Sequence, residues 1–211
     1  VIYDRTFHMT MIAGPASRQR KIPRISTIVS PPELALPLVE KRFVRMKRHR
    51  LAKAYKASRQ IIAVSKIAAD SATNFYQLPS NSITVLPNPV DTDALRQTIE
   101  QQQRPETAPT LKLVCVGRMT EEKGHRDLLN AIVIAQANWP NANPAIQLRL
   151  IGDGPLRTDL ELQAREIRKP HSVEFSGTLS NVGPSIINSD ALILPSLFEG
   201  MPNVVLEAMA L

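Results

Sequence analysis

Glu199 and Glu207 are two carboxylates with seven residues between them, and Gly200 and Pro202 stand where a helix can begin. Proline suits the first helical turn, because its missing N–H costs nothing there. We therefore expect Glu199 in the loop before a helix and Glu207 on the second turn. The free N–H groups at the helix start would bind an anion. Carboxylates that can bind hydroxyl groups, placed beside an anion site, suit a sugar nucleotide. The alternative is that Glu199 and Glu207 are ordinary solvated acids on a surface helix.

Two cations follow the apolar run at 111–116. Arg118 and Lys123 lie between Gly117 and Gly124, just before a helical pattern. Ligands of open α/β sheets bind outside the carboxyl ends of the strands. An arginine fork and a lysine point charge beside a helix start suit a diphosphate. A surface turn with solvated charges is the alternative.

Two further loops have the composition of ligand-contacting turns. The loop at 152–157 resembles a phosphate loop but lacks the three-glycine dinucleotide fingerprint, so a tight turn before a helix explains it equally well. The loop at 176–180 is small and polar, and it could lie against a flat base or merely turn the chain. No Ser-His-Asp set, histidine pair or carboxylate cluster for a metal occurs in these loops.

Short β-branched runs alternate with helical patterns, except in the first 24 residues, where the periodicity is too weak to assign an element. We predict strands at 24–29, 61–64, 82–86, 111–116, 146–151, 172–176 and 191–194. We predict helices at 38–58, 65–76, 91–103, 125–138, 155–168, 181–188 and from 202 onward. This alternation predicts an α/β fold with parallel sheets covered on both faces.

The domain organisation follows from the polar, proline-containing stretch at 101–109. We predict the C-terminal part of a first domain at 1–90, a linker at 91–109 and a second domain at 110–211. The chain begins without methionine and ends at Leu211 inside an apolar helical run. We therefore expect a fragment that lacks both termini of a longer protein.

The charge is concentrated near the start of the chain. Residues 1–60 hold 14 Lys/Arg and 3 Asp/Glu, a net of +11, whereas the remainder holds 12 and 16, a net of −4. The basic stretch at 41–59 could face an anionic membrane surface or an anionic acceptor, with a solvated helix face as the alternative. Aromatic residues make up only 4% and offer no stacking platform, which argues against nucleic acid. No apolar stretch reaches the roughly twenty residues of a transmembrane helix.

The ordered set of motifs resembles the family 4 retaining glycosyltransferases. The segments that carry the resemblance are 61–65, 85–91, 116–124, 151–157 and 194–209. The resemblance implies the GT-B fold, with two Rossmann-like domains, the first incomplete and the second nearly complete but truncated. It also implies a UDP-, GDP- or similar nucleotide-sugar donor, held mainly by the second domain without a metal or a cofactor.

The resemblance also assigns roles to residues. Arg118 and Lys123 match the family's diphosphate-binding pair, Glu199 the carboxylate near the transferred sugar, and Glu207 the carboxylate that holds the ribose hydroxyls. We take the first three as the catalytic set. The donor-binding set is Glu207, Gly117, Gly152, Gly200, Met201, Asn203 and Val204. The family's Asn-Gly is Asn88-Pro89 here, and no histidine follows the strand at 24–29, so the acceptor side stays unassigned.

We therefore expect a retaining, hexosyltransferase-type enzyme that moves a sugar from a nucleoside diphosphate to the hydroxyl of a glycan or lipid-linked glycan. A cytoplasmic location is expected, with peripheral contact at the inner face of a membrane as an open option. Two alternatives remain at this point. The chain could be a dinucleotide-binding oxidoreductase with a Rossmann core, or a non-catalytic membrane or scaffold module that uses its basic helix.

Overall fold

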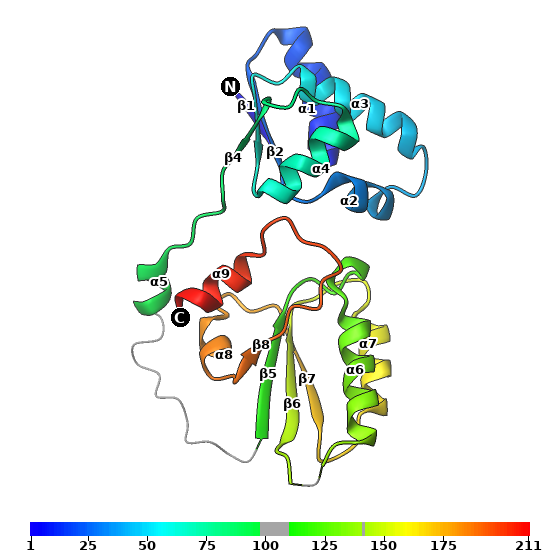
Figure 1. The fold of residues 1–211 in the computed structure, drawn as a ribbon, viewed down its shortest axis with the longest axis vertical. Coiled ribbons are helices and arrows are strands. Elements are labelled where there is room, and N and C mark those ends of the chain that lie inside the picture. Colours follow the sequence, from blue (N-terminus) through cyan, green and yellow to red (C-terminus); the bar gives the residue numbers. More distant parts are fainter. Residues whose placement is uncertain (98–109, 141) are drawn as a thin grey trace. The chain divides into compact units, whose positions relative to one another are not determined.

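The computed structural model describes residues 1–97, 110–140 and 142–211. It divides into two compact units (Figure 1). The first unit consists of residues 1–89 with 198–202, and the second of residues 90–197 with 203–211. The part of the predicted linker at 98–109 lies outside the described residues.

The first unit is built on a parallel four-stranded sheet in the order β1-β2-β3-β4. Its strands are β1 (Ile2–Asp4), β2 (Arg24–Ile28), β3 (Gln60–Ala63) and β4 (Ile83–Val85). Its helices are α1 (Phe7–Arg20), α2 (Pro32–Val39), α3 (Val44–Lys56) and α4 (Lys66–Tyr76). The core lies between β2 and β3 on one side and α2, α3 and α4 on the other, and it includes Ile28, Leu36, Leu51 and Ile61.

The predicted helix at 38–58 is wrong, because the structure has two helices separated by residues 40–43. Phe43 has a φ of 58°, a left-handed conformation that an α-helix does not accommodate. Glu40 is extended and buried, and its carboxylate pairs with His8 at 2.8 Å and with Lys47. The hydrogen bond from Lys47 is the main reason that the pKa of Glu40 is lowered. The break thus turns the only carboxylate of this segment inward.

The second unit contains a parallel sheet in the order β7-β6-β5-β8. Its strands are β5 (Thr110–Val116), β6 (Ala145–Ile151), β7 (Ser172–Gly177) and β8 (Ala191–Leu192). Its α-helices are α5 (Thr92–Gln97), α6 (His125–Ala137), α7 (Arg157–Gln163), α8 (Gly183–Ile187) and α9 (Asn203–Ala210), and its 3₁₀ turns are η1 (Glu121–Lys123) and η2 (Ala164–Glu166).

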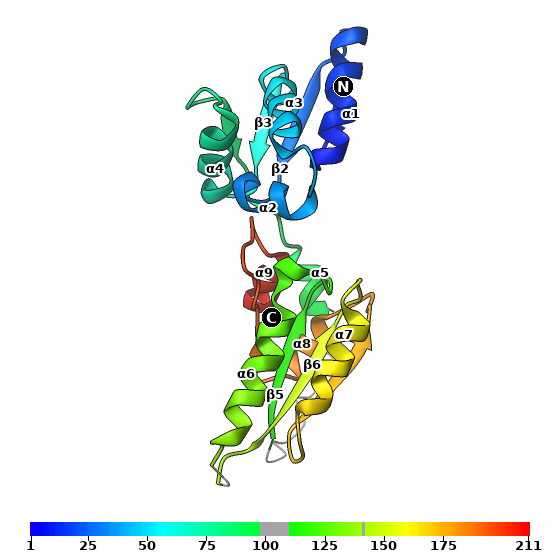
Figure 2. The same ribbon diagram turned by 90° about the vertical axis from the view of Figure 1, so that its right-hand side faces the viewer.

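Both faces of this second sheet are covered (Figures 1 and 2). Cys115 and Leu150 face the side of α6 and α7, where Leu129 and Leu160 complete a buried cluster. Neighbouring strand residues point to opposite faces, so Val114 lies in a second cluster, which Ile186 of α8 and Val204 and Ala208 of α9 share. The predicted α/β class with parallel sheets is confirmed.

Candidate functional site

The loops after β5 and β6 form one rigid rim at the carboxyl ends of the strands. Gly117 N–H donates to the Ile151 carbonyl at 2.9 Å, and Met119 N–H donates to the Asp153 carbonyl at 2.9 Å. Because these bonds continue the ladder between β5 and β6, the loop that carries Arg118 is fixed to its neighbour by the backbone.

The loops after β7 and β8 are tied to the same rim. Gly152 N–H donates to the Gly177 carbonyl at 2.7 Å, so the third loop is held by the second. Leu197 N–H donates to the Glu122 carbonyl at 2.9 Å, which joins the loop after β8 to the turn that precedes α6. Four loops that are distant in sequence therefore lie together, as expected for the carboxyl ends of parallel strands.

Glycines at the rim fall into two groups. Gly124 has a φ of 65°, and a Cβ on it would clash with the Pro195 carbonyl. Gly152 has a φ of 137°, and a Cβ there would clash with the Gly117 carbonyl. Both positions require glycine because the loops pack backbone against backbone. The structure thus gives Gly152 a packing reason, whereas its predicted contact with a donor stays a prediction.

Gly117 belongs to the other group. Its φ is not in the left-handed region, and a Cβ on it would meet only Lys123 Cδ at 3.8 Å and His125 Cε1 at 3.9 Å, which are ordinary contact distances. Within the described part of the chain, a Cβ at Gly117 would therefore fit at ordinary contact distances, so packing does not require a glycine at the point where β5 ends. This is the arrangement expected where a ligand approaches the backbone.

The two predicted cations lie on this rim. Arg118 is exposed, and its guanidinium makes no hydrogen bond or ion pair with any described residue. Lys123 closes η1, and its aliphatic chain lies beside Gly117. Gly124 then begins α6 without a side-chain cap, so the first N–H groups of this helix have no acceptor from a capping side chain. A lysine and a helix start beside an exposed arginine form an anion-binding arrangement.

His125, the first residue of α6, belongs to the same rim but was not among the predicted site residues. Its side chain is only 2% exposed, and neither ring nitrogen has a hydrogen-bond partner among the described residues. Burial lowers the pKa of His125, and the charge of Lys123 lowers it further, although Glu122 opposes the shift. The sequence pattern gave no signal, because His125 makes no metal-ligand spacing with another histidine.

Helix α9 places the remaining predicted residues of the second unit. Asn203 is its first residue, and Glu207 lies on its second turn, as expected from the sequence. Val204 packs under the sheet in the cluster with Val114. Val204 is thus part of the core through its side chain, which leaves only its backbone N–H for a ligand at the helix start.

Glu199, Gly200 and Met201 lie in the segment 198–202 that groups with the first unit. Asn88 donates from its backbone N–H to Met201 Sδ at 3.2 Å and from Nδ2 to the Met201 carbonyl at 3.3 Å. Gly200 lies so close to the Val29 carbonyl that a Cβ on it would clash. Glu199 is half-buried in the loop ahead of α9, which is the predicted position. The structure brings Gly117, Arg118 and Lys123 together on the rim of the second unit. Glu199, Gly200 and Met201 belong to the first unit.

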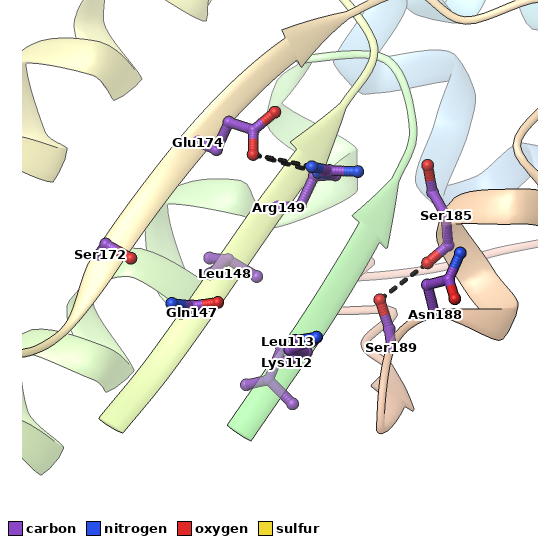
Figure 3. Close-up of a pocket in the computed structure, with 10 residues that line it drawn as sticks. All are labelled: Lys112, Leu113, Gln147, Leu148, Arg149, Ser172, Glu174, Ser185, Asn188 and Ser189. Carbon is purple, nitrogen blue, oxygen red and sulfur yellow. Dashed lines mark hydrogen bonds and ion pairs between the residues drawn. The ribbon is translucent and has the colours of Figure 1, made fainter. Parts of the chain in front are cut away.

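A separate hollow of about 420 Å³ lies along the same sheet (Figure 3). Arg149 of β6 pairs with Glu174 of β7 at 3.0 Å, and Glu174 also accepts from Ser176 at 2.7 Å. The hydrogen bond from Ser176 is the main cause of the lowered pKa of Glu174. The lining also includes Lys112, Gln147, Ser172, Ser185, Asn188 and Ser189, none of which belongs to the predicted site.

Within the described ranges, no three His, Cys, Asp or Glu side chains gather as metal ligands would. None of the described helices is long and apolar enough to span a bilayer. The predicted absence of a metal stays a prediction.

Comparison with known proteins identifies the family. A family model described as Glycosyltransferase Family 4 matches residues 1–94, and one described as Glycosyl transferases group 1 matches residues 110–211. The chain belongs to the family 4 glycosyltransferases. The resemblance inferred from the motifs is therefore confirmed.

Individual relatives of this family 4 chain agree with the assignment. An uncharacterised glycosyltransferase of Methanocaldococcus jannaschii is 27% identical over 74% of the chain and 39% of its own length. A lipopolysaccharide 1,6-galactosyltransferase of Escherichia coli is 31% identical over 62% of the chain and 34% of its own length. The chain thus spans between a third and two fifths of these two relatives.

A solved structure supports the fold. The Anabaena protein HepE in complex with UDP-glucose superposes with a TM-score of 0.75 at 16% identity, over 99% of this chain and 57% of HepE. Identity at this level shows the fold alone. The α/β fold is of the GT-B type, as predicted.

Proposed function

We propose that this chain is part of a retaining glycosyltransferase that transfers a hexose from a nucleoside diphosphate to an acceptor hydroxyl. The single observation that carries the proposal is the rim of the second unit. There the uncapped start of α6, Lys123 and Arg118 lie beside Gly117, where packing does not require a glycine, and Arg118 has no partner among the described residues. Family membership supports the reaction class.

In the proposed reaction, the anomeric carbon exchanges its bond to the diphosphate for a bond to the acceptor. The bond between the anomeric carbon and the diphosphate oxygen breaks, and the acceptor oxygen bonds to that carbon with retention. The hydroxyl proton passes to the departing phosphate oxygen. Negative charge grows on the diphosphate as the bond breaks, so Arg118, Lys123 and the helix start would stabilise the transition state more than the ground state. No metal is needed for this charge compensation in the proposal.

The two glutamates take different roles in the proposal. Glu207, on the second turn of α9, would hold the ribose hydroxyls equally well before and during the reaction. Glu199, in the loop before the helix, would position the transferred sugar rather than act as a nucleophile. Replacing Glu207 by Gln should therefore mainly raise the KM for the donor, whereas replacing Glu199 by Gln should mainly lower kcat.

The test is a calorimetric titration of the full chain with UDP, GDP and NAD, followed by kinetics with a panel of nucleotide sugars. We expect binding of a nucleoside diphosphate and none of NAD. Binding of NAD without UDP or GDP would favour the oxidoreductase alternative. Absence of binding to all three would overturn the donor-site proposal.

We also propose that the corner between α2 and α3 contacts an anionic membrane that carries the acceptor. Val39, Phe43 and Met46 are 54%, 71% and 50% exposed, although they are apolar. The cations of the corner are Lys41, Arg42, Arg45 and Arg50, and its one carboxylate, Glu40, is turned inward. Exposed apolar groups interspersed with cations favour the surface of an anionic bilayer. Leu51 and Tyr55 are buried in the core and take no part.

Flotation of the full chain with vesicles of phosphatidylcholine and phosphatidylglycerol tests this contact. Replacing Phe43 and Met46 by Ser should weaken binding, and replacing Arg42 and Arg45 by Gln should weaken it most at low salt. Ile67→Ser is the matched control, because Ile67 is 71% exposed on α4. Equal flotation of all variants would leave a solvated helix face as the explanation.

A further inference from the structure

Two buried histidines of the second unit differ in their partners. His171 is 7% exposed, its Nδ1 accepts from the Ile146 N–H at 3.1 Å, and its ring meets the edge of Trp139 at 5.8 Å between centroids. His125 is 2% exposed, and within the described ranges neither of its nitrogens has a partner. His171 is thus explained by the fold itself, whereas His125 is not.

A buried hydrogen-bonding group without a partner destabilises a folded protein, and an apolar side chain of similar volume would not. Desolvation and the nearby charge of Lys123 lower the pKa of His125, so its ring is neutral at pH 7. A neutral imidazole keeps one N–H donor and one acceptor nitrogen. The rim therefore holds an unused donor next to Lys123.

The position of the ring indicates what would use it. His125 opens the 13-residue helix α6, whose start has no side-chain cap. Its Cε1 lies 3.9 Å from the place that a Cβ on Gly117 would occupy, and Lys123 Cδ lies 3.8 Å from the same place. A Cβ on Gly117 would therefore make ordinary contacts with the ring and with Lys123, so the buried ring lies directly behind the backbone at the end of β5.

We propose that His125 is a ligand-binding residue of the donor site, whose ring N–H donates a hydrogen bond to a phosphate oxygen of the nucleoside diphosphate. The inference rests on the proposed function and adds a residue that the motifs did not assign. It also explains why the chain keeps a polar group where an apolar one would fit better: the partner arrives with the ligand.

The test uses His125→Leu and the matched control His171→Leu in the full chain, with UDP as the probe. Loss of a hydrogen bond to a charged acceptor should weaken UDP binding about tenfold or more in His125→Leu. Its Tm should stay equal or rise, because an unpaired buried polar group is removed. His171→Leu should lower the Tm and leave UDP affinity unchanged.

Two further variants sharpen the result. An amide at the right place can supply the same donor, so His125→Asn, which mimics Nδ1, or His125→Gln, which mimics Nε2, should recover part of the UDP affinity. Gly117→Ala should fold normally, since its Cβ has room, yet cover the ring edge and weaken UDP binding.

The outcomes separate the two proposals. If the parent chain binds no nucleoside diphosphate, the proposed function fails. If the parent binds UDP but His125→Leu binds it equally well, only the role of His125 is overturned. A fall in Tm with unchanged affinity would likewise assign His125 to the structure alone.

Discussion

The polar cluster at Arg24 in the first unit and the rim at Lys123 in the second unit use charged groups in opposite ways. The Arg24 guanidinium is fully buried and donates to Asp4 at 2.7 Å and to the Ala54 carbonyl. Asp4 also accepts from Thr10 at 2.5 Å. This cluster ties β1, β2, α1 and α3 together. On the rim, Arg118 and His125 have no partner among the described residues.

The difference concerns whether the partners of a charged or polar side chain lie within the fold. A polar group whose partners lie within the fold stabilises the fold, and removing it exposes the remaining partner to an apolar interior. A buried polar group without such partners lowers stability, and a ligand can supply the missing partner. An exposed cation without a partner is hydrated, so its removal costs little stability. Each of the following variants tests one side of this comparison.

The largest effect is expected in the first unit. Arg24→Met leaves the Asp4 carboxylate buried without its counter-charge, which should lower the free energy of unfolding by about 3–5 kcal/mol. Lys66→Met is the control, because its pair with Asp70 is exposed and should contribute less than about 1 kcal/mol. Urea unfolding measures both. Equal losses in the two variants would contradict a stabilising role for the buried cluster.

Arg118→Ala should show the reverse behaviour. The side chain has no partner among the described residues, so the free energy of unfolding should change by less than about 0.5 kcal/mol, as for ordinary surface substitutions. Loss of a charge-assisted contact should cost about 1.5–3 kcal/mol in UDP binding, and kcat should fall further because charge grows on the leaving diphosphate. Arg165→Ala, an exposed arginine of η2, is the control. Parent-like binding by Arg118→Ala would make the loop a simple charged turn.

Gly124→Ala and Gly117→Ala should separate the two kinds of glycine. At Gly124 the added Cβ meets a backbone carbonyl at a positive φ, which should lower the free energy of unfolding by about 1–3 kcal/mol. At Gly117 the same change should leave stability unaltered and weaken binding. Thermal unfolding and UDP titration of both variants measure the loss of stability and the loss of UDP affinity separately. Equal destabilisation would contradict the room for a Cβ at Gly117.

The smallest effect concerns pH. The folded-state pKa of His125 lies below its ordinary value of 6.5, so the unfolded chain binds a proton more readily. His125 therefore lowers stability as the pH falls below 6.5 toward its folded-state pKa, and it has no such effect above 6.5. His125→Leu should flatten the decline of Tm between about pH 6.5 and 5. An unchanged slope would show that the ring is not kept neutral by burial.

The sequence predicts most of the second unit because its signals are local. Alternation of strand and helix patterns locates β5, β6, β7 and α6 within about one residue at most ends. In the first unit, the helix predicted at 65–76 begins after Ser65, whose side chain accepts from the Ala68 N–H at 3.2 Å. Glu207 falls on the second turn of α9 because Pro202 marks the helix start.

The remaining features depend on contacts between distant residues. Helix α1 carries Pro15 and no clear apolar stripe, so its formation owes more to packing and the Thr6 cap than to pattern. The break at 40–43 buries Glu40 in pairs with His8 and Lys47, and local propensity does not report these contacts. The sequence does not indicate His125 as a site residue, because its burial arises only when the loops around it come together in the fold.

The backbone bonds that join the rim loops carry a consequence for how this enzyme family diversifies. Since Gly117 and Gly152 donate to the last residues of β6 and β7, and Met119 donates to the loop after β6, their amide protons should exchange as slowly as those in the strands. Insertions in such loops would break these hydrogen bonds, so under the proposed function a change of nucleotide or sugar should come from exchanging side chains on the rim. Donor preference in this unit should therefore evolve by point substitution.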